Sequence, residues 1–110
     1  MITTHVLDTA LGRPAAGVHV LLEVMDARDA WNVAGRGVTD SEGRLRTLLT
    51  SAPAAGVYRL VFDTRSYFER QGLRAFYPHI SVTFNVDDGD EHYHVPLLLS
   101  PFGYSTYRGT

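Results

Sequence analysis

The chain of 110 residues contains no cysteine, no lysine and no long apolar run. Without cysteine it can form no disulfide, no thiolate nucleophile and no zinc–sulfur site. All ten basic residues are arginine, so every cationic site carries a planar guanidinium instead of a point charge. No apolar stretch approaches the roughly 20 residues that a membrane-spanning helix needs. These absences exclude thiol-based chemistry and predict no membrane span.

Charge and length set further bounds. A net charge of −2 at pH 7 favours neither nucleic acid nor an anionic membrane surface as a partner. Residues 1–5 contain no basic segment leading into an apolar one, as a secretory signal would, so we expect a cytoplasmic protein. At this length, and with 45% apolar residues, we expect residues 1–110 to form one domain with a modest core.

Turn-forming residues recur at short intervals, between segments rich in β-branched and aromatic residues, which is typical of an all-β sandwich or barrel. Apolar and polar residues alternate in three segments, which predicts antiparallel strands with one buried face, at residues 18–24, 57–63 and 80–86. Weaker strands are expected at residues 4–9, 31–38, 43–49, 92–99 and 105–108. The pattern therefore predicts about eight strands in a two-sheet antiparallel β-sandwich.

Residues 66–72 break this rhythm and predict the single short helix. Ser66 is a candidate N-cap, Glu69 follows three residues later, and Gly72 is a typical residue at a helix end. We expect this helix to cross between the two sheets.

Five histidines are the only side chains that exchange protons near neutral pH without a large pKa shift. His92 and His94 stand two residues apart in an expected strand, so they share one face. Because Tyr93 and the alternate apolar residues after it would fill the core, the histidine face is expected to point toward solvent or a partner subunit. We interpret His19 and His79 as solvated side chains. The polar-aromatic C-terminal segment, which we expect to be docked, favours a function for His94.

A metal site is the second interpretation of the two neighbouring histidines. His-x-His is a metal-ligand spacing, but two imidazoles are a weak signal and no third ligand at a matching spacing is visible. Asp8, which precedes the turn at Gly12, is interpreted as a turn former and not as a catalytic acid. The sequence has no glycine-rich phosphate loop.

Arg44 and Arg46 are expected to share one face of a strand. Two guanidiniums on one face repel each other unless an anion, carboxylates or a ligand lies between them. Pairing with Glu42 or Asp40 at the surface explains them equally well. The residues by themselves thus predict a small antiparallel sandwich, oligomeric, with an outward face rich in histidine and arginine near an ordered C-terminus.

Motifs spread over the full length resemble the transthyretin-like family and, within it, the 5-hydroxyisourate hydrolases. The N-terminal motifs are THVLD at residues 4–8 and GRPA at residues 12–15. The central motif is TDSEGR at residues 39–44. The C-terminal motifs, which match the family signature at nearly every residue, are HYHVPLLLSP at residues 92–101 and YSTYRG at residues 104–109.

The resemblance implies a fold, an assembly and a reaction. The fold would be an eight-strand sandwich with one short helix, and the assembly a homotetramer, a dimer of dimers, with active sites in a channel between the dimers. The reaction would be hydrolysis of 5-hydroxyisourate, the product of urate oxidation, to 2-oxo-4-hydroxy-4-carboxy-5-ureidoimidazoline. No cofactor and no metal would be needed.

The resemblance also carries the family's catalytic positions to His5, Arg44 and His94. One neutral histidine would take a proton from the attacking water, and the arginine would stabilise negative charge on the carbonyl oxygen. Which histidine does so, and which one orients the water or protonates the leaving nitrogen, is left open. The C-terminal tail is expected to line the same pocket, and the substrate-binding residues would be His92, Tyr107, Arg108 and Thr110.

One position departs from the family pattern, and two other functions compete with hydrolysis. Thr110 stands where the family usually has serine. Threonine keeps the hydroxyl but adds a methyl group that changes the pocket's shape.

A small-molecule carrier of the transthyretin type would share the fold, so only the site residues can distinguish it. A structural or adhesive domain would explain the strands but not the docked tail.

Overall fold

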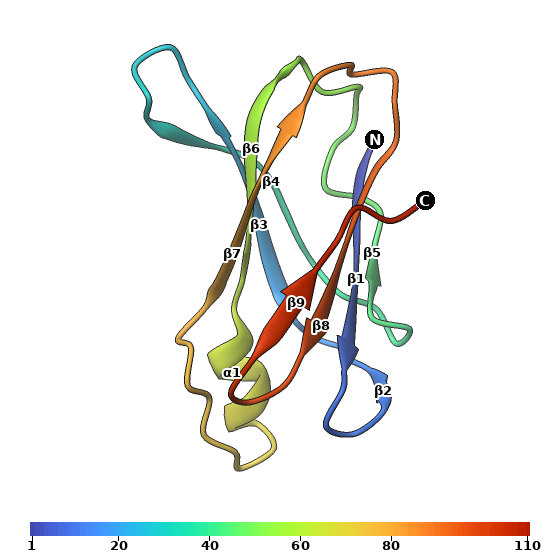
Figure 1. Cartoon of the computed structure of the whole chain (residues 1–110), viewed down its shortest axis with the longest axis vertical. Helices are drawn as coiled ribbons and strands as arrows, with labels where there is room; N and C mark the ends of the chain where they lie inside the picture. Colours follow the sequence, from blue (N-terminus) through green and yellow to red (C-terminus); the bar gives the residue numbers. More distant parts are fainter.

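The computed structural model describes all 110 residues and shows two sheets packed face to face (Figure 1). The first sheet contains β1 (Ile2–Asp8) and β8 (Tyr93–Leu99) at its centre, and β2 (Arg13–Pro14), β5 (Arg44–Leu45) and β9 (Tyr104–Thr106) around them. The second sheet has the order β4 (Trp31–Val38), β3 (His19–Met25), β6 (Gly56–Phe62) and β7 (Ile80–Val86). The predicted two-sheet sandwich is confirmed.

The core lies between the sheets and follows the period-two alternation of the strands. Val6, Leu97 and Leu99 enter it from the first sheet, and Leu60 and Phe62 enter it from the second, all fully buried. They belong to one cluster of 19 buried apolar residues. Burial of this kind is the main stabilising contribution to such a fold, and it leaves the outer face of each sheet for polar side chains.

The expected antiparallel pairing is wrong for the two central strands of the first sheet. β1 and β8 run parallel, with Ile2 opposite Tyr93 and Asp8 opposite Leu99. A parallel pair needs a long connection, and here the whole second sheet and the helix lie between the two strands in the chain. Alternation within a strand cannot show the direction of its neighbour.

Two short strands also differ from the expectation. β5 covers only Arg44–Leu45 of the predicted 43–49, and β2 was not expected. β5 starts directly after Gly43, whose φ of 76° is the left-handed conformation that glycine adopts easily. A side chain at that position would collide with the carbonyl oxygen of Val6. The tight turn therefore places Arg44, the next residue, beside β1.

The helix α1 (Thr64–Glu69) starts two residues earlier than predicted. Its N-cap is Asp63, whose carboxylate accepts hydrogen bonds from the Ser66 amide at 3.2 Å and the Ser66 hydroxyl at 2.8 Å. Ser66 therefore lies in the first turn and is not the cap. The helix lies away from both chain ends (Figure 1). It has six residues, and no helix here is long and apolar enough to cross a membrane.

The C-terminal segment is docked, as the sequence predicts. β9 pairs with β8, and the Gly109 amide then donates a 2.8 Å hydrogen bond to the His94 carbonyl. The Thr106 hydroxyl donates to the Pro96 carbonyl at 2.7 Å. Because β1 lies on the other side of β8, both ends of the chain meet at the same part of the sheet (Figure 1).

Candidate active site

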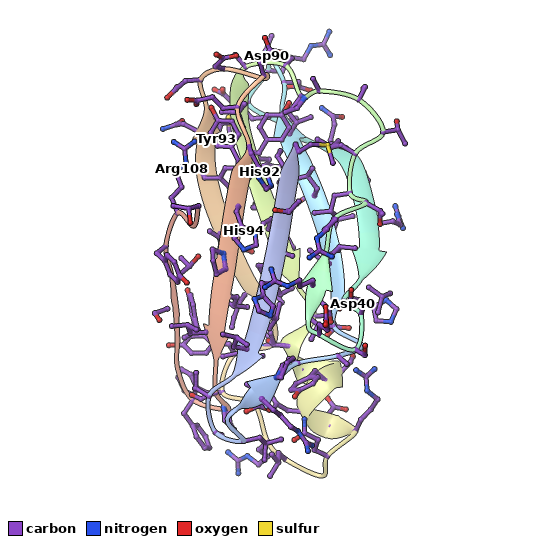
Figure 2. All side chains as sticks on the ribbon, turned by 90° about the vertical axis from the view of Figure 1, so that its right-hand side faces the viewer. Asp40, Asp90, His92, Tyr93, His94 and Arg108 are labelled. Carbon is purple, nitrogen blue, oxygen red and sulfur yellow. The ribbon has the colours of Figure 1, made fainter.

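The register of the first sheet brings four predicted or neighbouring residues to one outward face. The parallel pairing sets Thr3 opposite His94, and the antiparallel pairing with β5 sets His5 opposite Arg44. Thr3 and His5 are two residues apart in β1, so their side chains leave the same side of the strand. Figure 2 labels His94, the second residue of β8, and His92, which directly precedes β8.

A cavity of about 220 Å³ opens on this face. No apolar side chain lines it. Four parts of the chain form it: the start of β1, the segment at β5, the segment at the start of β8, and the end of the chain. The lining residues are Thr3, Thr4, Arg44, Arg46, His92, His94 and Thr110. Guanidinium, imidazole and hydroxyl groups are donors and acceptors for a small, flat, polar ligand.

The imidazole of His94 is held on two sides. Its Nδ1 lies 2.8 Å from the Thr3 hydroxyl oxygen, which is also 2.8 Å from His92 Nε2. Its Cδ2 edge faces Gly109, where an added Cβ would lie only 2.6 Å away. Glycine at 109 therefore allows the tail to close over the ring. The ring nitrogen that remains without a protein partner is Nε2.

The surroundings of His94 hold its pKa below the ordinary value of 6.5. Burial is the largest cause, because it disfavours the charged form, and the positive charges of Arg44, His92, His5 and Arg46 add to it. The imidazole is therefore neutral at neutral pH. A neutral imidazole with a free nitrogen can take a proton from water.

His5 lies beside the cavity without lining it. Its Nε2 donates a 2.8 Å hydrogen bond to the Glu42 carbonyl, which fixes the ring against the turn before β5. In neutral His5 the lone pair then lies on Nδ1. The structure thus places the two predicted catalytic histidines in different environments, with His94 inside the cavity and His5 at its border.

Neither Arg44 nor Arg46 has a carboxylate partner within 4.0 Å. The Asp40 carboxylate instead accepts the backbone amides of Glu42 at 2.9 Å and Arg44 at 3.0 Å, so it closes the turn. Surface ion pairing, the alternative explanation for the two arginines, is absent. Both guanidiniums face the cavity, which favours a ligand that is anionic or rich in carbonyl oxygens.

Two predicted substrate-binding residues lie elsewhere in the protomer. Tyr107 and Arg108 line a different cavity of about 240 Å³, next to Tyr93 and residues of β7. The Arg108 guanidinium stacks 4.6 Å above the Tyr93 ring and lies 3.6 Å from the Glu91 carboxylate (Figure 2). Of the predicted site residues, the structure therefore brings together Arg44, His92, His94 and Thr110, with His5 adjacent.

The cavity also contains residues that the sequence did not single out as a site. Thr3 and Thr4 precede His5 in β1, and only the parallel β1–β8 register places Thr3 against the histidines and Thr4 beside Val95. The sequence indicates Arg46 only through its spacing of two residues from Arg44. No three histidine or carboxylate side chains gather as ligands of one metal ion.

A larger cavity, of about 550 Å³, lies on the second sheet. Its lining includes His19, Arg36, Asp63 and His79. His19 and His79 are exposed, in agreement with their interpretation as solvated side chains. Because no hydrogen bond is made by either imidazole, volume alone does not make it the better candidate.

Asp8 acts as the turn former that the sequence predicts, and it has a second role. Its Oδ1 accepts the amides of Ala10 and Leu11 at 3.0 Å each. Its Oδ2 accepts the Tyr67 hydroxyl at 2.8 Å, which ties α1 to the end of β1. Burial, followed by the adjacent carboxylate, raises the pKa of Tyr67 to about 12.

Comparisons with known proteins show which family the chain resembles over its full length. The model of the HIUase/Transthyretin family matches residues 2–109. The 5-hydroxyisourate hydrolase of Salmonella dublin is 46% identical over 111 residues, covering 100% of this chain and 81% of that protein. The structure of Klebsiella pneumoniae 5-hydroxyisourate hydrolase is 35% identical with a TM-score of 0.88, covering 99% and 98%. Sea bream transthyretin in complex with thyroxine is 36% identical with a TM-score of 0.93, covering 99% and 94%.

Proposed function

This chain belongs to the HIUase/transthyretin family, and we propose that residues 1–110 are a single hydrolase domain acting on 5-hydroxyisourate. The product would be 2-oxo-4-hydroxy-4-carboxy-5-ureidoimidazoline. The observation that carries the proposal is the meeting of a neutral His94 with two unpaired guanidiniums in a small polar cavity. The relatives named as 5-hydroxyisourate hydrolases support the choice of substrate.

In the proposed mechanism His94 is the general base. Its free Nε2 takes a proton from a water molecule, whose oxygen attacks a ring carbonyl carbon of the substrate. General-base assistance of this kind contributes about 10²–10⁴-fold to rate. The ring carbon–nitrogen bond then breaks, the nitrogen takes a proton from the imidazolium, and the new carboxylic acid ionises. Water is consumed, and no external acid or base is needed.

Arg44 would stabilise the negative charge that develops on the attacked carbonyl oxygen. Its guanidinium is already free of carboxylate partners, so no ion pair has to break before the substrate binds. Arg46 lines the same cavity and would bind another polar edge of the ring. His5, fixed by the Glu42 carbonyl, would orient the water or the substrate.

His92 and Thr110 are proposed substrate contacts because they line the cavity with His94. Tyr107 and Arg108 remain predicted contacts, and they would reach substrate only in a site completed by another subunit. We propose a homotetramer for this reason. Exposed aromatic side chains at and near the free edge formed by β9 support association, among them Phe102, Tyr104 and Tyr107. The cytoplasmic location stays a prediction from the sequence.

A carrier function is the second candidate, and the similarity to a thyroxine complex of transthyretin is the observation that favours it. The lining of the cavity argues against it here. A hydrophobic ligand is usually held by apolar and aromatic side chains, whereas none lines this cavity and two arginines and two histidines do. Such a lining fits a small polar heterocycle better.

A spectroscopic assay tests the proposal directly. Urate oxidase generates 5-hydroxyisourate, the protein is added, and the decay of the transient absorbance is followed. We expect decay faster than the spontaneous rate and proportional to protein concentration. A decay rate that does not depend on the protein would contradict the proposed reaction, and saturable binding without turnover would support the carrier function.

A further inference from the structure

A single hydroxyl group, that of Thr3, lies between the imidazoles of His92 and His94. Thr3 Oγ1 is 2.8 Å from His94 Nδ1 and 2.8 Å from His92 Nε2. Thr3 is only 5% exposed, although it lines the cavity with the two rings. Both rings line the cavity, and His92 is exposed whereas His94 is half-buried, so the hydroxyl connects a more exposed ring with a less exposed one.

The number of hydrogens restricts how these three groups bond. A threonine hydroxyl has one hydrogen, so it can donate to only one of the two rings. When it donates to His92 Nε2, it must accept from His94, whose hydrogen is then on Nδ1. Neutral His94 in this arrangement keeps its lone pair on Nε2. If the hydroxyl donates to His94 instead, the hydrogen of neutral His94 is on Nε2, and that nitrogen cannot act as a base.

The position of the His94 ring decides which of its two nitrogens faces the cavity. Nδ1 is occupied by Thr3, and the Cδ2 edge is covered by Gly109. Nε2 is the nitrogen left for a water molecule in the cavity. The group that bonds one nitrogen of a histidine determines what the other nitrogen can do.

We propose that Thr3 is a positioning residue that holds His94 in its Nδ1–H tautomer, with His92 accepting the hydrogen of the Thr3 hydroxyl. The choice of this arrangement rests on the proposed hydrolysis, which needs the lone pair of His94 on Nε2, but the tautomer can be measured without substrate. Thr3 touches no reacting atom in this scheme. It leaves Nε2 of His94 free as the base, and it continues to accept from Nδ1–H after His94 has taken up a proton.

The test compares Thr3→Val, which keeps the branched shape and removes the hydroxyl, with Thr3→Ser, which keeps the hydroxyl. The ¹⁵N chemical shifts of the His94 ring report the tautomer in the full-length protein without substrate. We expect wild type and Thr3→Ser to carry the hydrogen on Nδ1, and Thr3→Val to lose that preference. The kcat of Thr3→Val should fall about 10- to 100-fold, as when an outer partner of a functional histidine is removed, with KM little changed.

Thr9→Val is the matched control. The Thr9 hydroxyl donates to the Leu99 carbonyl at 3.0 Å, just beyond the other end of β1, so its loss should leave the His94 spectrum and kcat unchanged. His92→Phe, which removes the outer acceptor, should also reduce the Nδ1–H population of His94.

An unchanged His94 tautomer in both Thr3→Val and His92→Phe would overturn the proposal, as would normal kcat in Thr3→Val. If wild type shows the Nδ1–H tautomer but no hydrolysis, the proposed function fails while the role of Thr3 in setting the tautomer stands.

Discussion

At the scale of single residues, the site depends on one imidazole whose neighbours keep it neutral and on one guanidinium without a carboxylate partner. His94 and Arg44 come from segments fifty residues apart, yet both face the same cavity. Their chemistry leads to three predictions.

Replacing His94 with alanine should abolish most turnover while the protein stays folded. The side chain lies on the outer face of its sheet and contributes little to the core, so the circular dichroism spectrum should be unchanged. Loss of a general base costs about 10²–10⁴-fold in rate. The measurement is the decay of freshly generated 5-hydroxyisourate, and near-normal decay would show that His94 is not the base.

Arg44→Lys should impair the reaction strongly although it keeps the positive charge. Lysine cannot present two parallel donors to a flat substrate, and loss of one donor to a developing oxyanion costs about 10²–10³-fold in kcat. Steady-state kinetics on the same substrate measure this. Arg36→Lys, on the second sheet, is the matched control and should behave like wild type. Wild-type kinetics for Arg44→Lys would mean that Arg44 is only a surface charge.

The pH dependence of activity should reflect the lowered pKa of His94. Only the neutral form can accept a proton, so kcat/KM should be constant around neutral pH and should fall in acid, below the ordinary value of 6.5. Stability shifts in the same direction. The unfolded state binds the proton more readily than the folded state, so folding is weakened as the pH falls through this range. An acid limb above pH 6.5 in the kcat/KM profile would contradict the assignment.

At the scale of elements, short polar contacts fix where strands and helix begin. Asp63 determines the start of α1, and Asp40 together with Gly43 determines the start of β5. The contact between Tyr67 and Asp8 joins α1 to the first sheet. The contact between Tyr67 and Asp8 is remote from the cavity, so its loss should affect stability and not chemistry.

Tyr67→Phe should therefore destabilise the protein without lowering kcat. It removes the donor to Asp8, which is 1% exposed, and leaving a buried acceptor without its partner costs about 1–3 kcal/mol. Tyr77→Phe is the matched control, because no hydrogen bond is made by the Tyr77 hydroxyl and its unfolding curve should equal that of wild type. Chemical denaturation measures both, and equal stability of the two variants would contradict the role of the contact.

At the scale of the whole molecule, the cavity lies on an outer face of the sandwich and includes Thr110 at the end of the chain. Both chain ends lie at the same part of the first sheet (Figure 1). The outer location of the cavity suits a site that a second subunit covers, since an open cavity exposes the base and the arginines to bulk water. The tail residues Tyr107 and Arg108, which face a different cavity within the protomer, fit such an assembly.

Sedimentation velocity should accordingly show a tetramer, and activity should fall on dilution to concentrations at which it dissociates. In such a tetramer, the exposed aromatic residues along the edge at β9 would provide the apolar contact surface. A stable monomer with full activity would show that one chain holds a complete site, and the predicted substrate contacts of Tyr107 and Arg108 would then be abandoned.

Much of the element content was predictable from the residues, because alternation is a local property. The strands at Trp31–Val38 and Ile80–Val86 were predicted at their observed bounds, and the outward face of His92 and His94 follows from the same period of two. The sequence predicts the helix but starts it two residues late. The N-cap is Asp63 and not Ser66, because the Asp63 carboxylate accepts two hydrogen bonds from Ser66.

The sequence by itself determined the two-sheet sandwich, the family and the identity of the residues that could do acid–base chemistry. Only the tertiary structure decided that β1 and β8 run parallel, that Thr3 stands between the two imidazoles, and that Tyr107 and Arg108 leave the cavity. The physical reason is that side-chain alternation depends on neighbours in the chain. Strand direction, register and the electrostatic surroundings of His94 depend instead on contacts between segments far apart in it.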